Sequence, residues 1–130
     1  MASIFTKIIQ GEIPCYKVAE SADYFAFLDI QPRTKGHTLV VPKVEGDYIF
    51  DMEEEAYTGL LQFARKVAKA IEEAVPCERI GMAVIGLEVP HTHVHLVPLN
   101  AIGDLNFDHP AAELSPEEFE ATAAAIRAKL

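Results

Sequence analysis

The sequence contains little of what marks several classes of protein. Its two cysteines, Cys15 and Cys77, lie far apart and neither belongs to a C-x-x-C pair, so we expect reduced thiols rather than disulfides or a zinc knot. No apolar run approaches the roughly 20 residues of a membrane-spanning helix, and residues 1–14 lack the apolar stretch of a signal peptide. We therefore expect a cytoplasmic protein with no membrane partner.

Basic residues are also scarce. The 11 Lys and Arg are outnumbered by 20 Asp and Glu, which gives a formal net charge of −9. This charge repels the phosphate backbone of nucleic acids at long range, so no nucleic-acid partner is expected. A small phosphorylated ligand remains compatible with it, because salt screens the field over about 8 Å.

Repeats, low-complexity tracts and Gly/Ser linkers are absent from the chain. Its 130 residues suit one domain, and a domain of this size buries roughly two thirds of its unfolded surface. Half of the residues are hydrophobic and 24% are charged, which is typical of a globular protein. Residues 1–130 are therefore predicted to form a single domain.

Hydrophobic periodicity predicts an α+β fold. A short helix is expected behind Ser3 as its N-cap, and a long amphipathic helix is expected between a capping box of Asp51 and Glu54 and the helix-breaking Pro76. A C-terminal helix is expected after the N-cap Ser115. Strands joined by short connections, which favour antiparallel pairing, are predicted within residues 24–30, 37–42, 80–85 and 91–99.

Three of the five histidines alternate in the segment VPHTHVHLVP. On a strand, His91, His93 and His95 would project from one face and form one wall. Imidazole suits acid–base and nucleophilic chemistry near neutral pH. A central ring whose second nitrogen bonds to a fixed acceptor can attack, while its neighbours bind an oxyanion or protonate a leaving group.

Two other interpretations of these histidines remain open. They could lie on a solvated sheet face without a function, or they could bind a metal ion such as zinc. Three successive residues on one strand face span about 13 Å, which strains the coordination of one tetrahedral ion. No metal is therefore expected.

The segment HTHVHLV resembles the signature of the histidine-triad family of nucleotide hydrolases and transferases, with Thr92 as a departure from its apolar pattern. The blocks SIFTKIIQGEIP, FAFLDIQP and GHTLVVPK resemble further family blocks in the same order, so that the resemblance covers residues 3–98. Within the family, the sequence most resembles the nucleoside-phosphoramidase-like branch. The resemblance implies an antiparallel five-stranded sheet with one long helix, and a homodimer with that helix near the partner.

The implied reaction is attack on the α-phosphate of a purine nucleotide derivative, such as a nucleoside 5′-phosphoramidate, through a nucleotidyl-histidine intermediate and without a cofactor. By position, the resemblance implies that His93 is the nucleophile and that the backbone carbonyl of His91 holds its other nitrogen. His95 is implied to contact the phosphate or the leaving group. His37 is implied to support the triad from a neighbouring strand.

The resemblance also implies substrate-binding residues. Asp29 matches the acid that holds the ribose hydroxyls, a task that suits a carboxylate because it accepts two hydrogen bonds. Phe5, Ile8, Phe27 and Ile30 match positions that line the base pocket.

Several residues depart from the family pattern. Glu88 stands where many relatives have a serine before the first histidine, and Ile85 or Gly86 stands where they have an asparagine. An ionised Glu88 would repel the phosphate by about 4 kcal/mol at a separation of ~4 Å and an effective dielectric of roughly 20, so we expect it to pair with a triad imidazole. Ser3 and Thr6 replace the Cys-x-x-Cys of zinc-binding relatives, so the structural zinc of that subgroup is not expected.

Two alternative functions are compatible with the same residues. One is a nucleotide-binding regulatory protein in which the departure at Glu88 weakens or abolishes turnover. The other is a histidine metal-binding protein. Turnover that depends on His93 would indicate the enzyme. Tight nucleotide binding without turnover would indicate the regulatory protein, and binding of a stoichiometric metal ion would indicate the metal-binding protein.

Overall fold

The computed structural model describes residues 2–130, so Met1 of the predicted domain lies outside the described residues. The α-helices are α1 (Ile4–Ile9), α2 (Glu54–Ala74) and α3 (Pro116–Arg127). The strands are β1 (Lys17–Glu20), β2 (Tyr24–Leu28), β3 (Thr38–Pro42), β4 (Arg79–Ala83) and β5 (Val94–Leu99). Two 3₁₀ turns, η1 (Ile49–Asp51) and η2 (Ile102–Leu105), lie in the connections.

The five strands form one sheet in the order β1-β2-β3-β5-β4, and each neighbouring pair is antiparallel. This confirms the α+β fold with a five-stranded sheet, a long helix and a C-terminal helix. Periodicity alone missed β1, because this edge strand has four residues of which only Val18 is buried. A strand of that length shows too little alternation to stand out.

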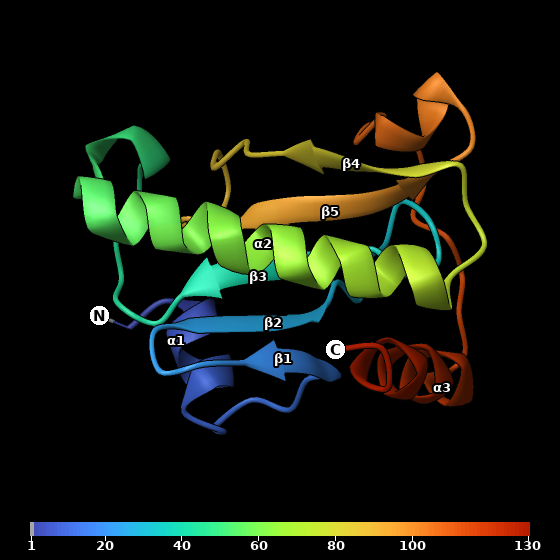
Figure 1. Cartoon of the computed structure of the whole chain (residues 1–130), viewed down its shortest axis with the longest axis horizontal. Helices are drawn as coiled ribbons and strands as arrows, with labels where there is room; N and C mark the ends of the chain where they lie inside the picture. Colours follow the sequence, from blue (N-terminus) through green and yellow to red (C-terminus); the bar gives the residue numbers. More distant parts are fainter. Residues whose placement is uncertain (1) are drawn as a thin grey trace.

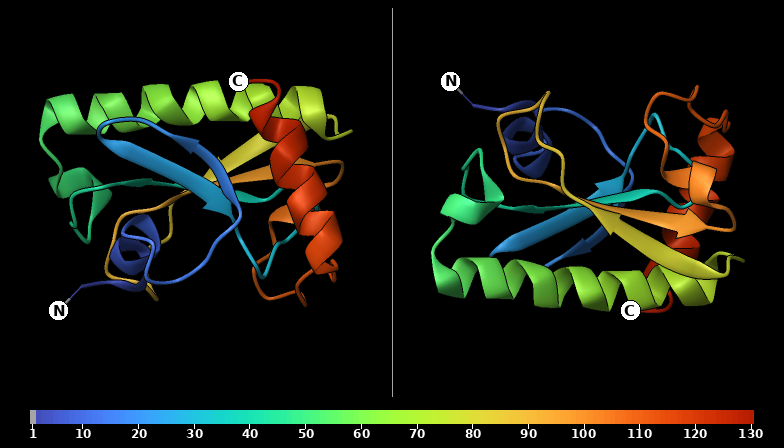
Figure 2. Two further views of the ribbon diagram at one scale, coloured as in Figure 1. Left: turned by 90° about the horizontal axis from the view of Figure 1, so that it is seen from below. Right: turned by 90° about the horizontal axis from the view of Figure 1, so that it is seen from above.

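Helices cover the two faces of the sheet unequally (Figures 1 and 2). The long helix α2 lies along one face, where its buried Leu60, Val67 and Ile71 pack in one core with Val40 of β3 and Val94 of β5. The short helix α1 lies on the opposite face (Figure 2). Its residue Phe5 packs there in a second apolar cluster with Phe25, Phe27, Leu39 and Val41.

Two of the three predicted helix starts are confirmed. The Ser3 hydroxyl accepts a hydrogen bond from the Thr6 amide at the start of α1, and Ser115 caps α3 as predicted, in a capping box with Glu118. The capping box of Asp51 and Glu54 is wrong. The chain makes the separate turn η1 at Asp51, and α2 begins after Glu53 without a side-chain cap.

Two further predictions concern the cysteines and membrane-spanning segments. Cys15 and Cys77 are free thiols, as predicted. Within residues 2–130, no helix has both the length and the apolar character needed to cross a membrane.

Candidate active site

The histidine segment is not one continuous strand. Strand β5 begins at Val94, so of the three histidines only His95 belongs to the sheet, where it pairs with Leu39 of β3 and Ala83 of β4. The prediction that alternation on one strand aligns all three rings is therefore wrong for His91 and His93. Backbone bonds that replace the ladder hold this part of the chain, including one from the Thr92 amide to the Gly46 carbonyl.

The ring of His93 is oriented by a backbone carbonyl. Its Nδ1 lies 2.7 Å from the carbonyl oxygen of His91. Because a carbonyl only accepts, Nδ1 bears the proton, and in the neutral ring Nε2 has a free lone pair. The ring of Phe5 packs edge-on against His93 at 5.0 Å between centroids, which places an apolar side chain of α1 beside this ring.

The ring of His37 sets the tautomer of the neighbouring His95 through a hydrogen bond. The Arg33 amide donates to Nδ1 of His37 at 2.9 Å, so the proton of the neutral His37 ring is on Nε2, which lies 3.0 Å from Nδ1 of His95. That bond makes His95 Nδ1 an acceptor and leaves its proton on Nε2. The chain of hydrogen bonds therefore leaves a donor on His95, whose ring centroid lies 5.1 Å from that of His93.

Both of these rings are neutral at pH 7. Burial is the largest cause that lowers the pKa of His37 to about 3, followed by repulsion from a protonated His95 and from Arg33. Burial likewise is the largest cause that lowers the pKa of His95 to about 4, followed by repulsion from a protonated His93 and from Arg33. Desolvation disfavours the charged form of imidazole, so the pair acts through hydrogen bonds and not through positive charge.

Asp29 lies at the end of β2 beside this pair. Burial raises the pKa of its carboxyl, although the Gln31 amide that donates to Oδ1 partly opposes the shift. Its Oδ2 is 3.6 Å from Nε2 of His37. Since His37 is neutral, this contact is not an ion pair.

Asp29, His37 and His95 could also be considered as metal ligands, because one ligand atom from each lies within 4.8 Å of the others. A metal at His37 Nε2 requires that nitrogen to lose its proton and Nδ1 to gain one. The Arg33 amide already donates to Nδ1 and would then oppose a second N–H. The hydrogen bonding of this cluster therefore favours a donor chain over metal coordination.

The other predicted substrate residues are distributed around the triad. Phe5 and Phe27 are buried and pack edge to face at 5.6 Å, Ile8 is half-buried against the same cluster, and Ile30 is 70% exposed next to Asp29. Glu88 is exposed and contributes to the raised pKa of Asp29. Among the described residues it forms no ion pair with a triad imidazole, so the expected pairing is wrong for this structure.

Two residues at this site were missed by sequence reasoning. Phe107 packs edge-on against His95 with the ring centroids 4.8 Å apart, and the guanidinium of Arg33 lies over the Phe107 ring at 5.7 Å. Arg33 also donates to the carbonyls of Asn106 and His109. These contacts hold the loop after η2 beside the triad, and no sequence motif predicts the packing of Phe107 on His95.

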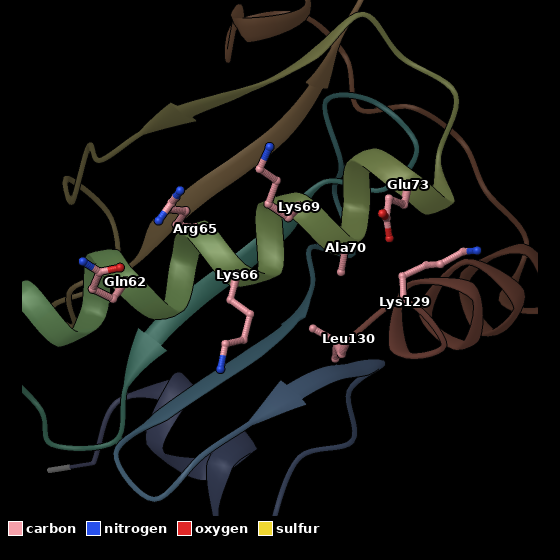
Figure 3. A pocket seen from close by; sticks show the side chains of 8 residues that line it. All are labelled: Gln62, Arg65, Lys66, Lys69, Ala70, Glu73, Lys129 and Leu130. Atoms are coloured by element: carbon pink, nitrogen blue, oxygen red, sulfur yellow. The ribbon is translucent and has the colours of Figure 1, made fainter.

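A separate hollow of about 400 Å³ lies between α2 and the C-terminal residues Lys129 and Leu130 (Figure 3). Arg65, Lys66, Lys69 and Lys129 line it. The side chains of Lys66 and Lys69 point to opposite sides of the helix (Figure 3). These cations do not converge on one ligand, so the histidine cluster is the candidate active site.

The comparisons with known proteins agree with this geometry. Residues 10–102 match the HIT domain family. The adenosine 5′-monophosphoramidase of Schizosaccharomyces pombe is 37% identical over 132 residues, covering 100% of this chain and 99% of that protein. The enzyme of the same name from Saccharomyces cerevisiae is 39% identical over 98 residues, covering 75% of this chain and 62% of that protein.

A solved structure shares the whole fold. The crystal structure of a Hit-like protein from Bartonella henselae superposes with a TM-score of 0.85 at 32% identity, covering 98% of this chain and 96% of the other. The matched family, the Schizosaccharomyces pombe relative that aligns over the full length, and the arrangement of His91, His93 and His95 agree with one another. The chain belongs to the histidine-triad (HIT) family.

Proposed function

We propose that this protein is a nucleotide hydrolase that cleaves the bond to the α-phosphate of adenosine 5′-phosphoramidates and related purine nucleotide conjugates, without a cofactor. One observation supports this most strongly. The Nδ1 proton of His93 is bound by the His91 carbonyl at 2.7 Å, which leaves Nε2 as a neutral nucleophile. The names of two relatives, both adenosine 5′-monophosphoramidases, support the substrate class.

The reaction that follows from these hydrogen bonds has two steps. Nε2 of His93 forms a bond to the α-phosphorus, the bond between phosphorus and the leaving nitrogen breaks, and the amine is released with a proton from solvent water. Water then cleaves the bond between phosphorus and His93 and releases the nucleotide. His93 is regenerated with its proton on Nδ1.

His95 acts as a hydrogen-bond donor in this proposal. Its pKa of about 4 makes it neutral, and the bond from His37 leaves a proton on Nε2 that can reach a phosphate oxygen. A fixed donor at an oxygen that gains negative charge stabilises the transition state. This favours binding of the oxyanion over protonation of the leaving group, the two roles considered for the flanking rings.

The nucleoside is proposed to bind next to the histidine rings, with its base at the apolar cluster beside His93 and its ribose at Asp29. Phe5, Ile8 and Phe27 form the apolar cluster beside His93 and supply a surface for the base, with Ile30 exposed at its edge. The Asp29 carboxylate supplies two acceptors for the ribose hydroxyls. The negative charge of Glu88, which acts on Asp29, is proposed to repel anionic groups that enter the site.

We also propose that the protein is a homodimer in the cytoplasm. The edge strand β4 pairs only with β5 among the described strands, and its Met82 is 57% exposed. A groove of about 490 Å³ between β4 and α2 includes Leu61, Ala68 and Met82 in its lining. An open strand edge next to an apolar groove is a ready site for a second copy.

Steady-state kinetics test the proposed activity. Adenosine 5′-phosphoramidate should be hydrolysed to the nucleotide and ammonia by the wild-type protein, and His93→Ala should lower kcat by at least about 1,000-fold, as expected for a removed nucleophile. Tight binding of the nucleotide without turnover in the wild type would instead indicate the regulatory protein. His109→Ala, which changes an exposed histidine, serves as the matched control.

A further inference from the structure

Ser3 is a buried residue whose hydroxyl contacts the histidine segment. It is 8% exposed, and its Oγ lies 2.7 Å from Nδ1 of His91. The other ring nitrogen of His91, Nε2, donates to the Pro42 carbonyl at 2.7 Å. In the neutral ring Nδ1 is therefore unprotonated and accepts the proton of the Ser3 hydroxyl. The fully buried ring of His91 is bound at both nitrogens.

Neighbouring groups direct the Ser3 proton to His91. Oγ accepts from the Thr6 amide at 3.1 Å, so its own proton is free to donate. The Thr6 hydroxyl donates to the Glu45 carboxylate at 2.6 Å, and that carboxylate also accepts from the Ser3 amide at 2.5 Å. The contact between the two hydroxyls is longer, at 3.3 Å, than the bond from Ser3 to His91.

The histidine segment depends on such anchors because it precedes the paired part of β5. Pairing with β3 involves Val94, His95 and Leu96. Thr92 is held by bonds from its amide and its hydroxyl to the Gly46 carbonyl. The carbonyl of His91, which accepts the proton of His93, is held in two ways. The Thr92 amide, which lies in the same peptide plane, bonds to the Gly46 carbonyl, and the His91 ring bonds to Ser3 and Pro42.

We propose that Ser3 is a positioning residue for the nucleotidyl transfer. Its hydroxyl holds His91, so that the His91 carbonyl keeps the proton of His93 on Nδ1 and leaves Nε2 free. The kinetic consequence of this assignment rests on the proposed function, whereas the consequence for the His93 tautomer does not. The start of α1 therefore contacts the histidine segment twice: Ser3 bonds to the ring of His91, and Phe5 of the proposed base pocket packs against the ring of His93.

The test compares Ser3→Ala with two matched variants. Ser3→Thr retains the hydroxyl, and Ser115→Ala removes the same kind of N-cap bond, from the Glu118 amide, at the distant helix α3. We expect Ser3→Ala to lower kcat for adenosine 5′-phosphoramidate about tenfold, the order expected for one lost hydrogen bond, with little change in KM. Ser3→Thr should restore kcat, and Ser115→Ala should leave it unchanged.

Nitrogen-15 NMR of the labelled histidine rings supplies a readout independent of activity. In the wild type the two nitrogens of His93 should have the distinct shifts of one tautomer, and in Ser3→Ala these shifts should move toward each other as the tautomers exchange. Wild-type shifts and wild-type kcat in Ser3→Ala would overturn the proposal, as would an equal loss of kcat in Ser115→Ala. If the wild type lacks turnover while Ser3→Ala still changes the His93 shifts, the proposed function fails and the positioning role stands.

Discussion

Acidification should destabilise the protein through the buried pair His37 and His95. In the unfolded chain both rings titrate near 6.5, whereas burial lowers the pKa of His37 to about 3 and that of His95 to about 4 in the folded state. Between these values the unfolded state binds protons that the folded state does not. The free energy of unfolding therefore decreases as the pH falls from 7 toward 4.

The magnitude follows from the two pKa differences. Between pH 7 and pH 5 each histidine should lower the free energy of unfolding by about 2 kcal/mol, and the pair by about 4 kcal/mol. The raised pKa of Asp29 acts in the opposite direction, because its folded form takes up a proton at a higher pH than the unfolded form. A comparison of matched variants separates the histidine contribution from such carboxylates.

Urea unfolding at pH 7 and pH 5 provides the assay. Glutamine retains a donor and an acceptor but does not titrate, so His37→Gln with His95→Gln should remove most of the histidine contribution, and His37→Gln alone should remove about half. His109→Gln at the exposed histidine should retain the wild-type pH dependence. Equal losses of stability in the wild type and the double variant would refute the assignment of buried neutral rings.

Three further predictions concern single residues. Glu88→Gln removes a negative charge near Asp29 and should raise kcat/KM for adenosine 5′-phosphoramidate about fivefold; unchanged kinetics on every leaving group would exclude a role for this charge. Gly59→Ala should lower the melting temperature, although alanine favours a helix by about 1 kcal/mol, because its Cβ would lie 2.1 Å from the Tyr24 hydroxyl; a higher melting temperature would contradict the packing there. Met82→Glu places a charge at the β4 edge and should convert the proposed dimer into a monomer in light scattering, whereas an unchanged mass would locate the interface elsewhere.

The fold was largely predictable because its longer elements have strong local signals. The apolar residues of α2 recur with the helical period, and Leu60, Val67 and Ile71 of this stripe are buried. The side chains of Ser115 and Glu118 each accept a hydrogen bond from the backbone amide of the other residue, so their capping box is encoded within four residues. The start of α2 was misplaced because Asp51 also fits the turn η1, and local pattern does not decide between the two.

The sequence predicted candidate site residues but not the hydrogen bonds that join them. Alternating histidines and family blocks predict a role for His93 and His95, whereas the bond from Ser3 to His91 joins residues 88 positions apart. The packing of Phe107 on His95 likewise depends on where the loop after η2 lies. Such contacts arise from tertiary packing, and no spacing in one sequence encodes them.

Covalent capture tests the central claim most directly. The wild-type protein and His93→Ala would be mixed briefly with adenosine 5′-phosphoramidate, quenched at alkaline pH and measured as intact proteins by mass spectrometry. We expect an adenylyl mass increase in the wild type alone, together with released ammonia. Ammonia release without any adduct in the wild type, or an equal adduct in His93→Ala, would contradict nucleophilic catalysis by His93.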